Sequence, residues 1–179
     1  MSAPREKHLL RGILAGVAGG LVASWVMNEF MAGPGKSLTH ALQTDEQNRK
    51  DEQSAQSGEP KEDSTMKTAE AIVHAVTGGR HLSTEEREKG GPIVHYAFGA
   101  VMGAVYGGLA EYTELVTAGF GTTFGAALFG GADLVAVPVL NLSGPPTQYP
   151  AASYASPFAA HIVYGVTTEL VRRGARALL

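Results

Sequence analysis

Four glycine-rich apolar stretches, each long enough or nearly long enough to cross a bilayer, constrain this 179-residue chain most strongly. A transmembrane helix needs about 20 predominantly apolar residues. The fourth stretch is the weakest, because its apolar run is short and ends in arginines. We predict an all-α fold: a polytopic membrane bundle of helices packed through glycine-rich faces, forming a single membrane domain over residues 1–179. The predicted spans cover residues 9–32, 92–110, 115–140 and 154–172.

Glycines recur every four residues inside these spans. A step of four residues returns an α-helix to nearly the same side, so each row forms a groove. Small residues there let a second helix backbone approach closely in lipid, which predicts a glycine zipper. The predicted packing positions are Gly12, Gly16, Gly20, Gly99, Gly103, Gly107, Gly121, Gly125 and Gly165.

Residues 33–90 form a polar insert between the first two spans. Residues 43–63 have almost no apolar side chains, which predicts disorder there. A short helix is predicted over 65–77 from its apolar spacing. Another is predicted over 84–89, where Ser83 and Glu86 form a capping box and Gly90-Gly91-Pro92 ends the helix.

Positive charge in short flanking segments predicts the orientation. Basic residues flank the first span at its start and follow the fourth span, whereas residues 141–156 contain no Lys or Arg. We therefore expect a multi-pass protein of the bacterial inner (cytoplasmic) membrane, with both termini in the cytoplasm and the insert outside. The first apolar run could instead be a secretory signal, but it exceeds the 7–15 residues of a signal core.

Ionisable side chains inside the spans are the candidate functional groups. A charge at mid-bilayer costs about 2.5–3.5 kcal/mol on insertion scales, so such groups usually face protein or water. Three interpretations remain open: structural hydrogen bonding between helices, proton or ion handling by histidines that titrate near physiological pH, and metal or haem binding. Because no fixed ligand spacing is present, we expect no metal and no cofactor. The predicted buried polar layer, near the outer ends of the spans, comprises His95, Asp133, His161 and Asn28.

A second charged group is predicted at the inner ends of the spans. Arg172 and Arg173 follow Glu169 at i+3 and i+4, and Glu111 ends the second span. Side chains at these spacings are neighbours on a helix surface. We interpret this group as solvated ion pairs at the level of the headgroups.

Composition excludes several other functions. The chain has no cysteine, so disulfides, thiol catalysis and cysteine-based metal sites are excluded. Its formal net charge is -3 and it has no basic patch, which argues against nucleic-acid binding. It lacks a nucleophile elbow and a phosphate-binding loop. We therefore expect no enzymatic activity and no catalytic residues.

Two segments resemble the YagU-like bacterial inner-membrane proteins. The string from His95 through Phe98 and Tyr106 to Ala110-Glu111 resembles the second span of that family. The segment from His161 to Arg173 resembles its last span, with His, Val, Glu and Arg-Arg at the same offsets. The resemblance implies a four-span inner-membrane protein of unassigned function. It supplies no catalytic residues.

The leading functional hypothesis is a non-enzymatic membrane protein that handles protons or ions during envelope pH stress. His95 and His161 would titrate and Asp133 would be their charge partner. The alternative is an accessory or scaffold protein that binds other membrane proteins, or a second copy of itself, through its glycine faces. A soluble glycine-rich helical protein is a third possibility. In the first two cases the lipid bilayer is the principal partner.

Overall fold

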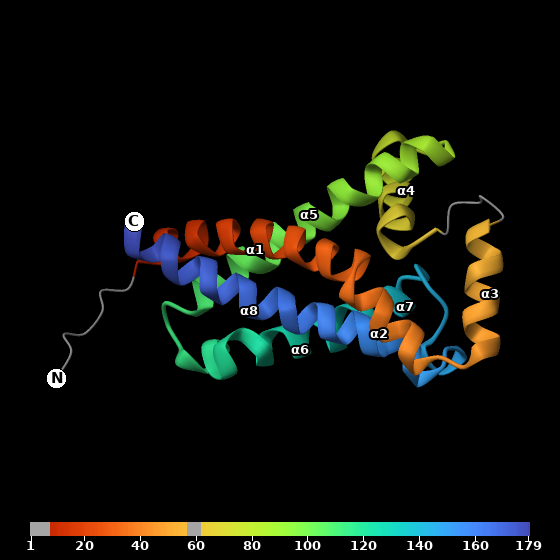
Figure 1. The fold of residues 1–179 in the computed structure, drawn as a ribbon. Coiled ribbons are helices and arrows are strands. Elements are labelled where there is room, and N and C mark those ends of the chain that lie inside the picture. The colour runs from red at the N-terminus through yellow and green to blue at the C-terminus, as the bar shows by residue number, and fades with distance from the viewer. Residues whose placement is uncertain (1–7, 57–61) are drawn as a thin grey trace. The chain divides into compact units, whose positions relative to one another are not determined.

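All regular elements in the described residues, 8–56 and 62–179, are helical in the computed structural model (Figure 1). This agrees with the predicted all-α class. Short 3₁₀ turns cover Glu114–Gly121, Pro146–Gln148 and Ala151–Tyr154, and a π-turn covers Ala132–Ala136. The α-helices are α1 (Leu9–Ala32), α2 (Pro34–Leu42), α3 (Asp45–Gln56), α4 (Ser64–Thr77), α5 (Thr84–Leu109), α6 (Thr122–Gly131), α7 (Val137–Val139) and α8 (Ala155–Leu178).

Three helical segments of the described chain are long and apolar enough to cross a membrane: Leu9–Ala32, Thr84–Leu109 and Glu114–Val139. A membrane protein is therefore the plain interpretation of the fold. Helix α8 has 24 residues but is not among the three. Its C-terminal half carries Glu169 and three arginines, which lower its mean hydropathy.

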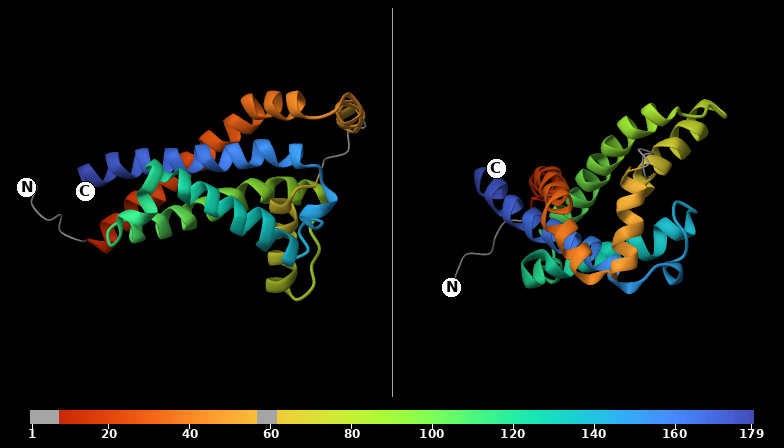
Figure 2. Two further views of the ribbon diagram at one scale, coloured as in Figure 1. Left: turned by 90° about the horizontal axis from the view of Figure 1, so that it is seen from below. Right: turned by 45° about the vertical axis from the view of Figure 1, so that its right-hand side comes forward.

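The chain divides into two compact units. Figure 2 shows its helices in two further views. The first contains the described residues up to Asn28 together with Tyr96–Leu128 and His161–Leu179. The second contains Glu29–His95 and Phe129–Ala160. Most of α1, the second half of α5, α6 up to Leu128 and most of α8 therefore belong to the first unit, which holds the candidate site.

In the first unit, α1 and α5 approach so closely that only glycine fits between them. A Cβ atom added to Gly16 would lie 2.1 Å from the carbonyl oxygen of Gly103, and one added to Gly103 would lie 2.2 Å from that of Gly16. The same holds for Gly20 against the carbonyl of Gly99, at 2.2 Å. Real Cβ atoms essentially never come within 3.0 Å of another heavy atom in this way. The four-residue glycine rows therefore set the distance between these two helices.

A second glycine contact joins α8 to the segment around α6. A Cβ on Gly165 would lie 2.1 Å from the carbonyl oxygen of Gly121, and one on Gly125 would lie 2.1 Å from that of His161. Gly121 also has a left-handed φ of 85°, which side-chain-bearing residues rarely adopt. This contact holds α8 against α6 within the first unit.

The third predicted span is not one regular α-helix. Gly119 and Phe120 take left-handed backbone angles, so regular α-helix begins only at Thr122. A π-turn follows around Asp133, where the Val137 N–H donates to the carbonyl of Ala132. Pro138 has no N–H to offer the preceding turn, and π-turns accommodate such local breaks in the ladder.

The prediction that Gly90-Gly91-Pro92 ends a short helix is wrong. Helix α5 runs without interruption from Thr84 to Leu109, with Pro92 inside it. In the second unit the two glycines pack against α4: a Cβ on Gly90 would lie 2.8 Å from Ala69 Cβ, and one on Gly91 3.0 Å from Met66 Cγ. These glycines therefore admit a neighbouring helix and do not mark an end.

Part of the segment predicted to be disordered is helical. Helix α3 covers Asp45–Gln56, and residues 57–61 lie outside the described residues. The helix begins with a reciprocal cap, in which the Thr44 N–H donates to Gln47 Oε1 and the Gln47 N–H donates to Thr44 Oγ1. Lys50 pairs with Glu46 one turn away, at 2.7 Å. Capping and i,i+4 pairs stabilise helices of polar residues, which an argument from hydrophobic content alone ignores.

We expect the turn between α4 and α5 to loosen in acid because of Glu70. The Leu82 backbone N–H and the His81 ring each lie 2.7 Å from the Glu70 carboxylate. The Leu82 hydrogen bond first, and His81 second, hold the pKa of Glu70 below its usual value. A lowered carboxylate pKa stabilises the fold above the unfolded pKa, and this contribution disappears as the pH falls through the folded-state pKa.

Hydrogen exchange at the Leu82 amide tests this expectation. Its protection should fall between about pH 5 and about pH 3 in the natural protein. In the Glu70→Gln variant it should be weak and independent of pH in that range. An equally pH-sensitive amide in the variant would show that another group controls the turn.

Candidate functional site

One face of α8 is lined by buried polar side chains. His161 is 7% exposed, Thr168 and Glu169 are 0% exposed, Arg172 is 3% exposed and Arg176 is 8% exposed. Their positions, at i, i+7, i+8, i+11 and i+15, place them along one side of the helix. Buried charges in proteins are usually paired, because removing a charge from water is costly. The contacts of this face therefore define the candidate site.

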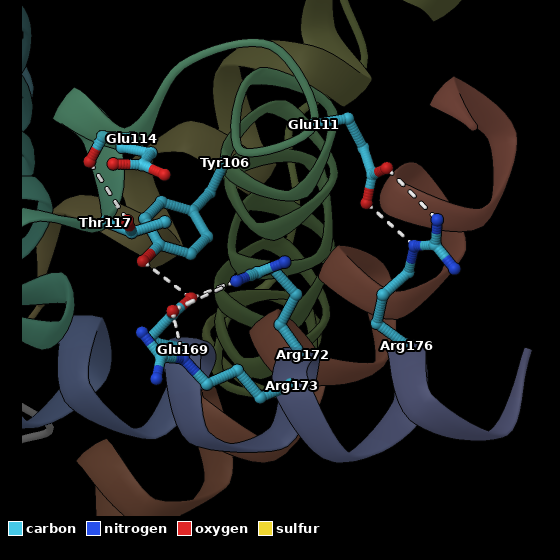
Figure 3. Close-up of polar contacts among 8 residues, drawn as sticks. All are labelled: Tyr106, Glu111, Glu114, Thr117, Glu169, Arg172, Arg173 and Arg176. Atoms are coloured by element: carbon cyan, nitrogen blue, oxygen red, sulfur yellow. Dashed lines mark hydrogen bonds and ion pairs between the residues drawn. The ribbon is translucent and has the colours of Figure 1, made fainter. Parts of the chain in front are cut away.

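Glu169 accepts hydrogen bonds from three side chains (Figure 3). The Tyr106 hydroxyl on α5 donates to Oε2 at 2.9 Å. Arg172 donates from Nε to Oε2 at 2.7 Å and from Nη2 to Oε1 at 3.0 Å. Arg173 donates from Nε to Oε1 at 2.6 Å. The paired donors of Arg172 match the two carboxylate oxygens, the geometry that makes such pairs strong.

A second ion pair lies toward the end of α8. Arg176 donates to Glu111 from Nε at 2.8 Å and from Nη2 at 3.2 Å. The two side chains are only 7% and 2% exposed. The backbone N–H of His8, just before α1, also donates to Glu111, at 3.2 Å. Glu111 therefore links α8 to the start of α1 and to the segment that follows α5.

Aromatic side chains enclose the cluster within the first unit. The Tyr106 ring lies 4.6 Å from that of Phe124 on α6, and the Arg172 guanidinium lies 5.9 Å from the Tyr106 ring. Arg173 lies 4.7 Å over the ring of Phe120. One turn along α8, the Tyr164 hydroxyl donates to the carbonyl of Gly99 at 2.6 Å. Aromatic rings therefore lie against the tyrosine and the two arginines that hold the fully buried Glu169.

The predicted ion pairs of Glu169 with Arg172 and Arg173 are present, but the expectation that this charged group is solvated is wrong. Glu169 is fully buried and Arg172 nearly so, whereas only Arg173 keeps an exposed side chain, at 54%. The glycine contact at Gly121 brings the backbone of that segment against α8 beside Glu169, since a Cβ on Gly121 would lie 3.2 Å from Glu169 Cβ, and the Tyr106 hydroxyl contacts the carboxylate from α5. In a setting of this kind, removing one partner leaves an uncompensated buried charge.

The residues of the predicted outer polar layer belong to two different units. His161 is buried and Asn28 is exposed, both in the first unit, so Asn28 lacks the burial expected for it. His95 and Asp133 are half-buried, both in the second unit. Their assembly into one layer stays a prediction. Among the described residues, no group of three or more His, Cys, Asp or Glu side chains is placed to hold a metal ion.

Sequence reasoning missed two members of the cluster, Tyr106 and Arg176. A signal for Arg176 was present: Glu169, Arg172 and Arg176 stand at i, i+3 and i+7, so the charges continue along one face. Tyr106 lies among the glycines of α5, and nothing in its spacing identifies Glu169 as its partner. That contact depends on the packing of α5 against α8.

Chemically, the arrangement can hold charge in a dry interior. The Glu169 carboxylate is saturated with donors, which suits a fixed anion. His161, two turns earlier on the same helix, is also buried.

A family model described as "Protein of unknown function (DUF1440)" matches residues 63–170. The match covers α4, α5, α6, the π-turn and α8 as far as Leu170. It therefore includes Tyr106, Glu111, His161 and Glu169. Neither the curated proteins nor the solved structures contain a match to this chain.

Proposed function

Because this chain belongs to the family described as protein of unknown function (DUF1440), which assigns no activity, we propose its function from the site itself. We propose an integral inner-membrane protein of four spans that handles protons through the buried polar face of α8. The resemblance to YagU-like inner-membrane proteins suggests the same membrane. The proposed setting is envelope pH stress.

The four-span arrangement is supported by the burial of the charges on α8. A segment with exposed charges would be unsuited to lipid, but Glu169 and Arg172 face the interior of the first unit and are paired there. Glycine contacts on α8 and between α1 and α5 support a bundle packed through small residues. With α8 as the fourth span, the arginines flanking both ends of the chain favour cytoplasmic termini.

The single observation that carries the proton proposal is a buried histidine on a continuous polar face. His161 lies on the same side of α8 as Tyr164, Thr168 and Glu169, all nearly inaccessible. Ionisable groups within spans usually mark ion or proton pathways. In this proposal His161 and His95 carry the proton, Asp133 is the charge partner toward the outer end, and Glu169 is the fixed charge at the inner end.

A proton-flux assay in proteoliposomes tests the proposal. Natural protein should dissipate an imposed pH gradient, monitored with a trapped pH-sensitive dye. His161→Ala should reduce the flux by about tenfold or more, the scale on which a positioned proton-transfer group acts. The matched control is His40→Ala, which removes an exposed histidine from α2 and should leave the flux unchanged.

Equal flux for His161→Ala and natural protein, at equal reconstituted amounts, would contradict the proposal. In cells, loss of the protein should lower survival of an acid challenge, and natural protein should restore it better than His161→Ala or His95→Ala. Equal rescue by natural protein and by the two variants would contradict a role of these histidines in proton handling.

The second candidate is an accessory protein that binds other membrane proteins through glycine faces. The rows on α1 and α5 face each other within the first unit, so they would not be free for a partner. Gly130 and Gly131 on α6 have open space around them, which favours α6 as the partner surface. Co-purification in mild detergent, compared between natural protein and Gly130→Leu, tests this candidate.

A further inference from the structure

One guanidinium nitrogen of Arg172 is left unsatisfied by the ionic cluster. The side chain is 4% exposed, and Nε and Nη2 both donate to Glu169. Within the described residues, Nη1 is buried and has no hydrogen-bond partner. Leaving a buried charged donor without an acceptor is costly. The position therefore suits an acceptor supplied from outside the chain.

The charge of the cluster indicates the sign of that acceptor. The ion-paired side chains are three arginines, at 172, 173 and 176, and two glutamates, at 111 and 169. Positive charge therefore exceeds negative charge by one. Guanidinium groups bind phosphate oxygens with the same paired geometry that they use for carboxylates. An anion bearing phosphate oxygens satisfies both the spare donor and the excess charge.

Arg173 provides the open side of this site. Its side chain is 54% exposed, and its guanidinium lies over the ring of Phe120 while Nε donates to Glu169. Arg172 lies between Glu169 and the Glu111–Arg176 pair (Figure 3). Arg173 is therefore the member of the site that an anion from solvent or from the membrane surface would contact first.

We propose that Arg172, beside Tyr106, and Arg173, over Phe120, form a binding site for a phosphate-bearing anion. Two sources offer this chemistry: the headgroup of an anionic phospholipid and free phosphate. Basic pockets between spans on the cytoplasmic side bind anionic headgroups. The headgroup source rests on the proposed orientation of α8, but the phosphate site itself does not, and neither depends on proton flux.

Equilibrium binding to the full chain in a neutral detergent tests the site. The probes are phosphatidylglycerol, phosphatidylcholine as the lipid without net charge, and inorganic phosphate, with bound lipid counted by native mass spectrometry. Phosphatidylglycerol should bind about tenfold more tightly than phosphatidylcholine, because a charge-assisted contact is worth about that factor. Arg172→Gln should remove most of this preference. The control Arg49→Gln, on the exposed face of α3, should retain it.

Arg173→Gln keeps the test decisive if Arg172→Gln fails to fold, because Arg173 is half exposed and its loss disturbs little packing. It should also weaken the binding of phosphatidylglycerol. Competition by millimolar inorganic phosphate would identify free phosphate as a ligand, whereas a lack of competition would identify the lipid headgroup.

The proposal is overturned if Arg173→Gln and every folded Arg172 variant bind phosphatidylglycerol as natural protein does. It is also overturned if the two lipids bind equally and phosphate does not bind. Proton flux by His161 is measured separately, so failure of one proposal leaves the other standing.

Discussion

Replacing Glu169 with glutamine is expected to lower the free energy of unfolding by about 3–5 kcal/mol, the usual effect of removing one partner from a buried ion pair. The substitution keeps the size of the side chain but leaves Arg172, 3% exposed, without its carboxylate. It also removes a charged acceptor from Tyr106 and Arg173. Chemical or thermal unfolding in mild detergent, followed by helical circular dichroism, measures the change.

The matched control is Glu46→Gln on α3. Glu46 and its partner Lys50 form an i,i+4 ion pair whose side chains are 69% and 70% exposed. Exposed pairs of this kind contribute about 0.3–0.5 kcal/mol, so this variant should unfold almost as natural protein does. Comparable losses in the two variants would mean that the Glu169 cluster is solvated in the folded protein.

Gly103→Leu is expected to have the second large effect, by forcing α1 and α5 apart. Even the Cβ atom would lie 2.2 Å from the carbonyl oxygen of Gly16 and 2.8 Å from the Cα of Gly20. Backbone atoms cannot move aside as a flexible side chain can. The destabilisation should therefore exceed the roughly 1–3 kcal/mol of ordinary overpacking. The same unfolding measurement applies, with loss of the folded, monodisperse protein as the extreme result.

Gly174→Leu is the control for this substitution. Gly174 lies in α8 with open space around it. Leucine is a better helix former than glycine by up to about 1 kcal/mol, so the variant should be as stable as natural protein or slightly more so. A stable Gly103→Leu variant would show that α1 and α5 are not in direct backbone contact.

The apolar glycine-rich stretches made the helical class and the membrane character predictable from sequence. Helix α1 has the bounds predicted for the first span, and α4 begins within one residue of its predicted start. These elements follow local rules of apolar spacing and capping. The same rules predicted a helix end at Gly90 and Gly91, which is wrong. From sequence alone, a glycine that lets a neighbouring helix approach cannot be distinguished from a glycine that ends its own helix.

The buried cluster was harder to predict, because the burial of a side chain inside the protein cannot be deduced from its spacing along a helix alone. Arg172 and Arg173 stand at spacings that suit equally an exposed ion pair and a buried one. Glu169 and Arg172 are buried, and two contacts accompany this: the approach of α8 to the segment before α6 at Gly165 and Gly121, and the hydrogen bond from Tyr106 to the Glu169 carboxylate. Gly119 and Phe120 take left-handed backbone angles, and the Phe120 ring lies under Arg173. The sequence around these two residues is apolar, so it did not indicate that the helix is interrupted there.

The placement of α8 in the membrane is the central claim, and site-directed labelling tests it most directly. The chain has no cysteine, so single cysteines can be introduced at Ala55, Thr113, Gln148 and Leu179 without background. A membrane-impermeant maleimide applied to spheroplasts should label Ala55→Cys and Gln148→Cys, whereas Thr113→Cys and Leu179→Cys should react only after permeabilisation. Labelling of Gln148→Cys and Leu179→Cys from the same side would contradict the account, because α8 would then not cross the bilayer.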